Sequence, residues 1–201
     1  LTGAALGLEA IVGGSRPVWA FACAVAAATL LASGAYQVVE RTLIALVGLM
    51  SLVFIATAIQ LGPDLPQLFG ALVRPRVPAG GGMLVLALIG TTVVPYNLFL
   101  HAAAVREKWR DRDAAAALAE SRLDSAVAVT LGGVITLAIL LTAVPLYLAA
   151  VQVQGVGEMA RQLEPLLGPQ ARWSFGLGLF AAGFTSAITA PLAAAWATAG
   201  L

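Results

Sequence analysis

The sequence predicts an all-α polytopic membrane protein, and three observations predict it. Of the 201 residues, 60% are hydrophobic and only 10% are charged, whereas a soluble domain carries about 25% charged residues. The mean hydropathy is +0.93. Apolar runs of about 20 residues recur along the chain, and this is the length that crosses the roughly 30 Å hydrocarbon core of a bilayer as a helix.

We expect residues 1–201 to form a single transmembrane domain. Its predicted spans cover residues 1–14 (a partial span), 18–35, 43–61, 83–104, 126–151 and 173–201. The first run is too short to cross a bilayer alone, and Leu1 and Leu201 both lie within apolar runs. These features lead us to expect an internal fragment of a longer membrane protein.

The links between the spans predict an orientation in the plasma membrane. Residues 105–124 are the most charged segment, and their alternating signs are typical of a solvated helical link. Because basic residues are densest there, the positive-inside rule places loop 105–122 in the cytoplasm. Residues 62–82 contain four prolines and are predicted to be an extramembrane loop on the opposite side, along the membrane surface. Tyr36–Arg41 is predicted to be a short polar link.

The span at residues 83–104 is interrupted near its middle by Gly90, Thr91, Thr92 and Pro95. Proline lacks a backbone N–H and clashes with the carbonyl four residues earlier, so the Thr91 carbonyl loses its helical partner. In lipid, such a carbonyl is tolerated only where it faces protein or a water-filled cavity, and freed carbonyls can bind cations. We therefore predict a helix broken at a cation site. The alternative is a simple proline kink, with Gly and Thr as packing residues.

Several polar residues are candidates for lining a pathway or relaying protons. Tyr96 and Asn97 follow the break and would line a cavity, the alternative for Tyr96 being an interfacial or packed aromatic. His101 is a candidate proton relay because histidine titrates near neutral pH, although a lone histidine near a helix end is more often interfacial. Glu9 is a second relay candidate, since acids at membrane depth are costly, or it snorkels to the interface.

Hydroxyl and carboxyl groups on the later spans have two interpretations each. Thr185, Ser186 and Thr189 lie on neighbouring positions of one predicted helix. Their hydroxyls would line the pathway, bond back to carbonyls one turn earlier, or bond a neighbouring helix. Asp124, at the start of its predicted span, would cap that helix or line the cytoplasmic exit.

The composition and motifs argue against several other functions. The chain shows no GxSxG, HExxH or Walker sequence and no paired acids inside a span, so we expect no enzyme activity. Cys23 is the single cysteine, which excludes an internal disulfide and a cysteine-based metal cluster. A net charge of +1 without a basic aromatic surface gives no indication of nucleic-acid binding. The sequence leaves the oligomeric state open.

Three segments resemble the Nramp family of divalent-metal transporters. Gly90–Ala103, GTTVVPYNLFLHAA, resembles the sixth helix of that family, whose motif runs Ala-x-x-Met-Pro-His-Asn-Leu, and His101 matches a Leu-x-His that often follows. Ala181–Ala194, AAGFTSAITAPLAA, resembles the eighth helix, with the pattern AAGQSSTITGT. Gly34–Arg41, GAYQVVER, resembles the link between the fourth and fifth helices of a subgroup with Pro-Tyr in place of Pro-His. The matches run from the end of helix three into helix eight.

The resemblance implies a fold of two inverted five-helix repeats, with an unwound sixth helix and alternating access around a divalent cation. It implies that the Thr91 carbonyl is a metal ligand and that Thr92, Pro95, Tyr96 and Asn97 lie along the pathway. The divalent cation and the lipid bilayer are then the expected partners, and no cofactor is expected because the cation is the substrate.

The chain departs from the family motif at two positions. Val94 occupies the position of the family's methionine ligand and has no donor atom. A thioether favours soft ions, whereas Mg²⁺ prefers oxygen ligands and keeps its waters, so valine is more compatible with Mg²⁺, as in the Nramp-related magnesium transporters. Tyr96 replaces the histidine of the motif and does not titrate near neutral pH, which puts proton coupling at this position in doubt.

The functional prediction is therefore transport of divalent cations of the Mn²⁺, Mg²⁺ and Fe²⁺ class. Two alternatives stay open. The first is a transporter of the same fold for amino acids or other organic solutes, in which the positive ends of half-helices bind a carboxylate. The second is a membrane scaffold that transports nothing, in which Gly and Pro serve packing alone.

Overall fold

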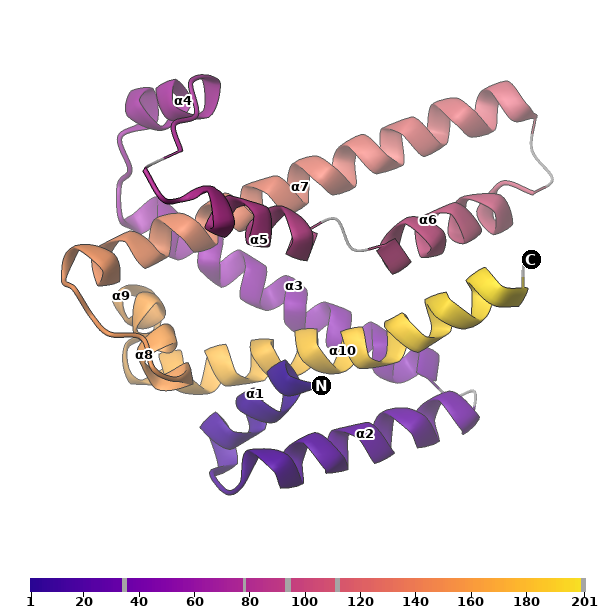
Figure 1. The fold of residues 1–201 in the computed structure, drawn as a ribbon, viewed down its shortest axis with the longest axis horizontal. Helices are drawn as coiled ribbons and strands as arrows, with labels where there is room; N and C mark the ends of the chain where they lie inside the picture. The colour runs from indigo at the N-terminus through magenta and orange to yellow at the C-terminus, as the bar shows by residue number, and fades with distance from the viewer. Residues whose placement is uncertain (34–35, 78, 93–94, 111–112, 200–201) are drawn as a thin grey trace. The chain divides into compact units, whose positions relative to one another are not determined.

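A computed structural model describes residues 1–33, 36–77, 79–92, 95–110 and 113–199, and every regular element in these ranges is helical (Figure 1). The α-helices are α1 Thr2–Val12, α2 Arg16–Ser33, α3 Tyr36–Gln60, α4 Leu65–Val73, α5 Gly82–Thr92, α6 Pro95–Lys108, α7 Ala114–Leu148, α8 Val156–Ala160, α9 Glu164–Leu167 and α10 Ala171–Ala199. Two 3-10 turns, η1 Arg161–Leu163 and η2 Gly168–Gln170, flank α9.

The lengths and hydropathy of these helices confirm an all-α polytopic membrane protein. Within the described ranges, four helical segments are long and apolar enough to cross a membrane: Arg16–Ser33, Arg41–Gln60, Ala115–Leu148 and Val156–Ala195. Thr2–Val12 and Gly82–Thr91 are apolar but shorter.

Two predicted links continue into a neighbouring helix. Tyr36–Arg41, predicted as a short polar link, forms the first turns of α3, and the predicted helical link at residues 105–124 joins the following span without interruption from Ala114, where α7 begins. Neither stretch contains proline or glycine, and Ala, Leu, Glu and Arg favour helix wherever they lie relative to the membrane. Asp113 caps α7, since its Oδ2 accepts the backbone N–H groups of Ala115 and Ala116 at 3.1 and 3.2 Å.

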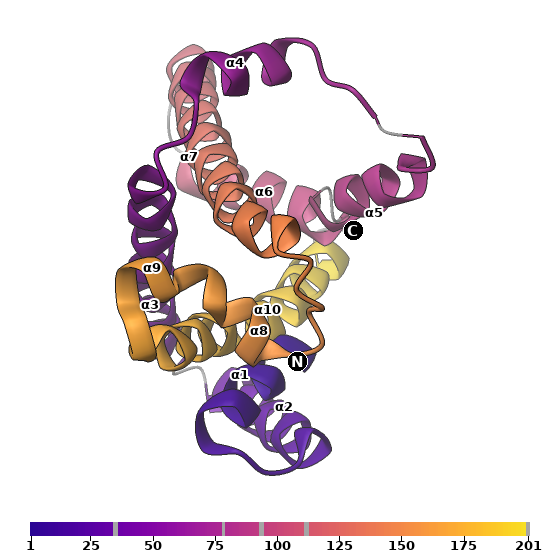
Figure 2. The ribbon, with the colours of Figure 1, turned by 90° about the vertical axis from the view of Figure 1, so that its left-hand side faces the viewer.

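The chain divides into two compact units, of which the first comprises Leu1–Gly62 and Ala128–Thr189. In this unit α1 packs along α2 and crosses α10 (Figures 1 and 2). Small residues allow this close crossing, because a Cβ atom on Gly183 of α10 would lie 2.9 Å from the Gly3 carbonyl carbon of α1. The buried cluster around the crossing consists of Ala4, Cys23, Ala27, Leu43, Ala181, Phe184 and Ile188.

A second buried cluster in the same unit joins α3, α7 and the C-terminal helices. It comprises Phe54, Ala58, Ala138, Leu163 and Ala171. The rings of Phe54 and Phe175 meet edge to face with their centroids 6.2 Å apart, a preferred arrangement for aromatic pairs. This contact helps to hold α10 beside α3.

The second unit comprises Pro63–Val127 and Ala190–Leu201. It contains α4, α5, α6 and the first part of α7. Asp64 begins α4 as its N-cap, with its Oδ1 accepting the Gln67 backbone N–H at 3.1 Å, and Pro66 follows in the first turn, where proline is tolerated. The predicted loop at residues 62–82 thus contains a short helix.

Candidate functional site

The predicted third full span, residues 83–104, is helical on both sides of the predicted interruption. Helix α5 is described up to Thr92 and α6 from Pro95 (Figure 1). Val93 and Val94 lie outside the described residues, as do the side chains of Thr92, Pro95, Tyr96 and Asn97.

The hydroxyl and carbonyl oxygens of Thr91 differ in their hydrogen bonding. Its hydroxyl donates to the Leu88 carbonyl oxygen at 2.8 Å, so the side-chain proton is engaged within α5. Its backbone carbonyl would pair with the N–H of residue 95 in a continuous helix, and Pro95 has none. The last carbonyls of a helix carry partial negative charge, and this end of α5 is therefore suited chemically to a cation.

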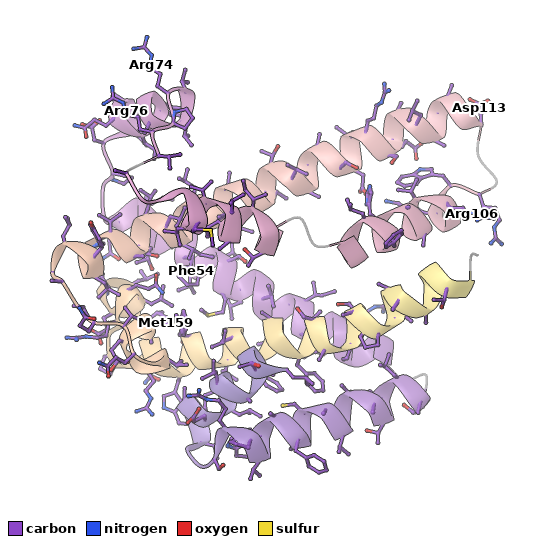
Figure 3. All side chains as sticks on the ribbon, viewed as in Figure 1. Phe54, Arg74, Arg76, Arg106, Asp113 and Met159 are labelled. Carbon is purple, nitrogen blue, oxygen red and sulfur yellow. The ribbon has the colours of Figure 1, made fainter. Side chains whose placement is uncertain are left out.

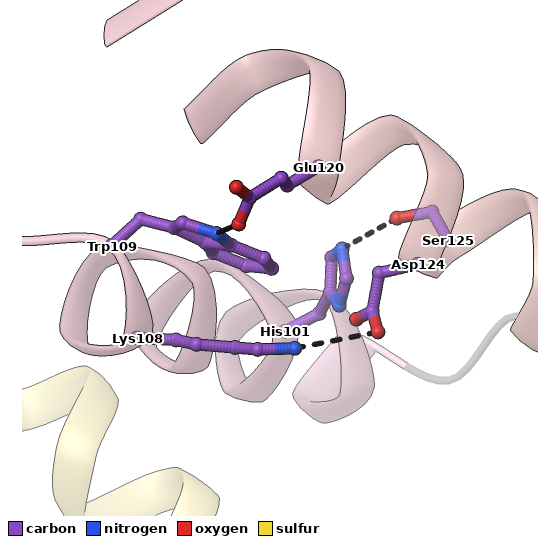
Figure 4. A network of polar contacts seen from close by, with 6 residues as sticks. All are labelled: His101, Lys108, Trp109, Glu120, Asp124 and Ser125. Atoms are coloured by element: carbon purple, nitrogen blue, oxygen red, sulfur yellow. Dashed lines mark hydrogen bonds and ion pairs between the residues drawn. The ribbon is translucent and has the colours of Figure 1, made fainter. Parts of the chain in front are cut away.

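His101 lies on α6 and contacts α7 (Figure 4). Its Nε2 lies 3.2 Å from the Ser125 Oγ, and the ring tautomer decides which of the two donates. At the preceding position of α7, Asp124 Oδ1 accepts from Lys108 Nζ at 3.4 Å. Asp124 therefore lies inside α7, and the expectation that it caps a helix is wrong, since α7 starts about ten residues earlier than the hydropathy suggests.

The same pair of helices is also joined by Trp109 and Glu120, near the end of α6 and the start of α7. The indole Nε1 donates to Glu120 Oε2 at 2.8 Å, and Lys108 Nζ lies 4.4 Å from the centroid of the indole ring (Figure 4). Trp109 is 8% exposed. The charged segment predicted as a solvated link thus forms specific contacts between α6 and α7.

The three candidate hydroxyls of α10 bond within their own helix. Thr185 donates to the Ala181 carbonyl at 2.7 Å, Ser186 to the Ala182 carbonyl at 2.9 Å, and Thr189 to the Thr185 carbonyl at 3.1 Å. A hydroxyl that donates in this way keeps oxygen lone pairs as acceptors, so this arrangement remains compatible with lining a cation pathway. Thr185 belongs to the first unit and Thr91 to the second.

Glu9 lies at the end of α1 in a cavity of about 170 Å³ with two arginines. Its Oε2 accepts from Arg16 Nε at 2.8 Å, with side chains 33% and 52% exposed respectively. Arg172 Nε donates to the Ala10 carbonyl at 3.0 Å and so satisfies one of the last carbonyls of α1. Exposed pairs of this kind contribute little to stability, and this geometry matches the interfacial alternative for Glu9.

One buried polar contact gave no signal in the sequence. Thr142 lies on α7 and is 1% exposed. Its hydroxyl is directed at two acceptors, Gln162 Oε1 at 3.1 Å and the Ile139 carbonyl oxygen at 2.9 Å. A single threonine in an apolar run and a glutamine in a polar link look ordinary by themselves. Gln162 also lines an apolar cavity of about 370 Å³ with Met50, Phe54, Met159 and Phe175 (Figure 3).

Acidic, histidine and cysteine side chains do not gather into a metal site in the described residues, where no three of them lie together. The chain's candidate ligands for a cation are therefore oxygen atoms of the main chain and of hydroxyl groups, of which the Thr91 carbonyl has the clearest physical reason to be unpaired.

The helices define the class of this protein as an all-α polytopic membrane protein. The sequence pattern of the Nramp family, described as natural resistance-associated macrophage protein-like, matches residues 1–201. The chain belongs to the Nramp family, and the resemblance noted in three segments is confirmed over its whole length.

Curated relatives agree with this family. A "Divalent metal cation transporter MntH" of Caldanaerobacter subterraneus subsp. tengcongensis is 29% identical over 162 residues, 78% of this chain and 38% of that protein. Transporters of the same name are similar in Yersinia pestis, 31% identical over 65% of this chain and 32% of that protein, and in Pectobacterium carotovorum subsp. carotovorum, 28% identical over 95% of this chain and 47% of that protein. The chain thus spans less than half the length of these relatives.

Proposed function

We propose that the protein carrying this chain transports divalent metal cations across a membrane by alternating access, with Mg²⁺ or Mn²⁺ as the substrate. Membership of the Nramp family supports the proposal, as do the relatives, which are named as metal cation transporters. The observation that carries it is Pro95, which has no N–H to pair with the Thr91 carbonyl, within the segment that resembles the sixth helix of the family.

The proposed site assigns separate roles to the residues around the break. The Thr91 carbonyl oxygen ligates the cation, because Pro95 cannot supply the N–H that would pair with it. Thr92 of α5 and Tyr96 and Asn97 of α6 are pathway residues in this proposal, and so are Thr185, Ser186 and Thr189 of α10.

The preference for hard ions within this class, Mg²⁺ above all, follows from position 94. Valine there supplies no sulfur, so the site lacks the soft ligand that favours Cd²⁺ and Fe²⁺, and oxygen ligands suit hard ions that keep part of their water shell. In the same proposal the 105–122 loop lies in the cytoplasm and the membrane is the plasma membrane. His101 and Glu9 are the candidate proton relays.

Transport by the full-length protein in proteoliposomes tests this function. We expect uptake of Mg²⁺ or Mn²⁺ that an ionophore for the same ion releases, and no uptake by empty vesicles. A protein that moves neither ion but accumulates an amino acid would replace the proposal with the alternative in which the positive N-terminal end of α6 binds a carboxylate. A protein that moves no solute would support the scaffold alternative.

A further inference from the structure

Helix α4 separates its side chains into two faces. Leu65, Leu68, Phe69, Leu72 and Val73 follow the spacing i, i+3, i+4, i+7 and i+8, which places them on one stripe of a helix. The opposite face holds Pro66, Gln67, Gly70 and Ala71, which are small or uncharged. A helix with this pattern is built to bury one side only.

Four of the five stripe residues are exposed among the residues that the structure describes, and Leu68 is half-buried. Leu65, Phe69 and Leu72 are 55%, 62% and 56% exposed, and Val73 is 78% exposed. No residue of α4 is buried. An apolar stripe on a capped and well-formed helix needs something to cover it, because contiguous exposed apolar surface of this kind marks an interaction site.

The chain itself holds α4 close to the membrane surface. Helix α3, a candidate span, ends at Gln60, and α4 begins at Leu65. Five steps along a fully extended backbone reach at most about 18 Å, and this link contains Gly62, whose φ is +61°. The distance from the end of α3 to the start of α4 is therefore at most about the diameter of one helix plus the thickness of the headgroup layer. If α3 leaves the hydrocarbon core at its end, α4 begins near the membrane surface.

Two arginines follow the stripe directly. Arg74 is the C-cap residue of α4, with its backbone N–H bonded to the Gly70 carbonyl at 3.0 Å, and Arg76 lies two residues further on (Figure 3). Both are exposed, and neither guanidinium has an ion-pair partner among the described residues. Asp64, the acid of this segment, is at the other end of the helix, about 14 Å away along its axis.

We propose that α4 is an interfacial helix that lies in the surface of the bilayer. The stripe from Leu65 to Val73 enters the boundary between headgroups and acyl chains, and Arg74 and Arg76 bind phosphate groups of the lipids. Guanidinium suits this role because it donates two parallel hydrogen bonds to a phosphate, and helices of this kind bind through apolar area together with attraction to anionic lipid.

Spin labels on the two faces of α4 test the proposal. Single cysteines replace Phe69 and Leu72 on the stripe and Gln67 and Ala71 on the opposite face, in a full-length protein that carries Cys23→Ala and no other cysteine. The protein is reconstituted in vesicles of zwitterionic lipid with 30% phosphatidylglycerol, a composition of our choosing that supplies roughly the anionic surface such helices need. Electron paramagnetic resonance then measures the access of each label to oxygen, which concentrates in lipid, and to a water-soluble nickel chelate.

We expect labels at 69 and 72 to meet oxygen more than the nickel chelate, and labels at 67 and 71 to show the reverse. Equal access of all four labels to the nickel chelate would mean that α4 is free in water and would overturn the proposal. Immobile labels at 69 and 72 that meet neither reagent would also overturn it, because they would show α4 packed on protein.

The arginines are tested separately with the label at position 72. Arg74→Gln with Arg76→Gln should reduce the ratio of membrane-bound to unbound label in anionic vesicles by about fivefold for each arginine removed. Arg161→Gln, which removes the same charge outside α4, should leave the ratio unchanged. An equal ratio in the double variant and the parent protein would overturn the phosphate contact.

Discussion

Gly7 of α1 and Gly176 of α10 meet backbone to backbone, because a Cβ atom placed on Gly176 would lie 3.1 Å from the Gly7 carbonyl oxygen. The reverse substitution is tighter still, since a Cβ on Gly7 would clash with the Gly176 carbonyl and would lie 2.6 Å from the Phe180 backbone nitrogen. These contacts involve main-chain atoms, which cannot rotate out of the way. The crossing of α1 and α10 therefore depends on glycine at position 7.

Gly7→Ala should destabilise the protein by about 1–3 kcal/mol, the usual cost of forcing extra atoms into a packed contact. The midpoint of thermal unfolding in detergent measures the effect. Gly48→Ala on α3 is the matched control, since a Cβ there meets no atom within 4 Å, and it should stabilise the helix by up to about 1 kcal/mol. Equal midpoints for the two variants would show that α1 and α10 do not cross at Gly7.

Thr142→Val should cost about 1 kcal/mol, because it removes the hydroxyl directed at Gln162 Oε1 from a site that is 1% exposed. Thr136→Val on the same helix is the control, since Thr136 is exposed and its hydroxyl bonds back to the Gly132 carbonyl. A double-mutant cycle with Gln162→Leu measures the coupling by thermal unfolding. Strictly additive effects would mean that the two side chains do not interact.

Trp109→Phe should loosen the contact between α6 and α7. The variant loses the 2.8 Å bond from the indole to Glu120 Oε2, and because Glu120 is exposed we expect a modest loss of about 1 kcal/mol, or about fivefold faster local opening. Hydrogen exchange of the peptides around residues 98–124 measures the opening. Trp173→Phe is the control, because Trp173 is exposed, and it should leave the exchange of these peptides unchanged. Equal exchange rates in the two variants would show that the bond from Trp109 to Glu120 does not stabilise the contact between α6 and α7.

Local patterns predicted the helical class, whereas contacts between helices were not predictable. Hydropathy is a property of each run by itself, so it indicated the apolar helices. It did not indicate that Tyr36–Arg41 belongs to α3 or that α7 is continuous from Ala114, because charged residues with good helix propensity continue a helix beyond an apolar run.

Contacts between residues far apart in the sequence depend on the tertiary fold. Nothing in the sequence indicates that Gly7 meets Gly176, that Thr142 meets Gln162, or that Trp109 meets Glu120, because each pair joins separate helices. Pro95 is different, since the missing N–H is a covalent property that removes the partner of the Thr91 carbonyl in any helix. This is why the candidate cation ligand could be proposed from the sequence.

Pro95→Ala should slow transport. Alanine restores the N–H that pairs with the Thr91 carbonyl in a continuous helix, and one added hydrogen bond of about 1 kcal/mol favours the unbroken form by about fivefold. The initial rate of Mg²⁺ or Mn²⁺ uptake into proteoliposomes should fall by at least that factor. Pro145→Ala is the control, since Pro145 lies inside the continuous helix α7. Full activity of Pro95→Ala would show that transport does not need the break.

Val94→Met should change the selectivity of the site rather than its overall activity. The thioether adds a soft ligand, so we expect uptake of Cd²⁺ or Mn²⁺ to rise relative to Mg²⁺ by about tenfold, which corresponds to about 1.4 kcal/mol of preferential binding. Competition between the ions during uptake measures the ratio.

Val94→Leu separates the sulfur from the size of the side chain, because leucine is close to methionine in volume and has no donor atom. If position 94 faces the ion, only methionine shifts the ratio. The same shift in both variants would assign the effect to volume. An unchanged ratio in both would mean that residue 94 points away from the cation, and the basis for preferring Mg²⁺ or Mn²⁺ at this site would then be lost.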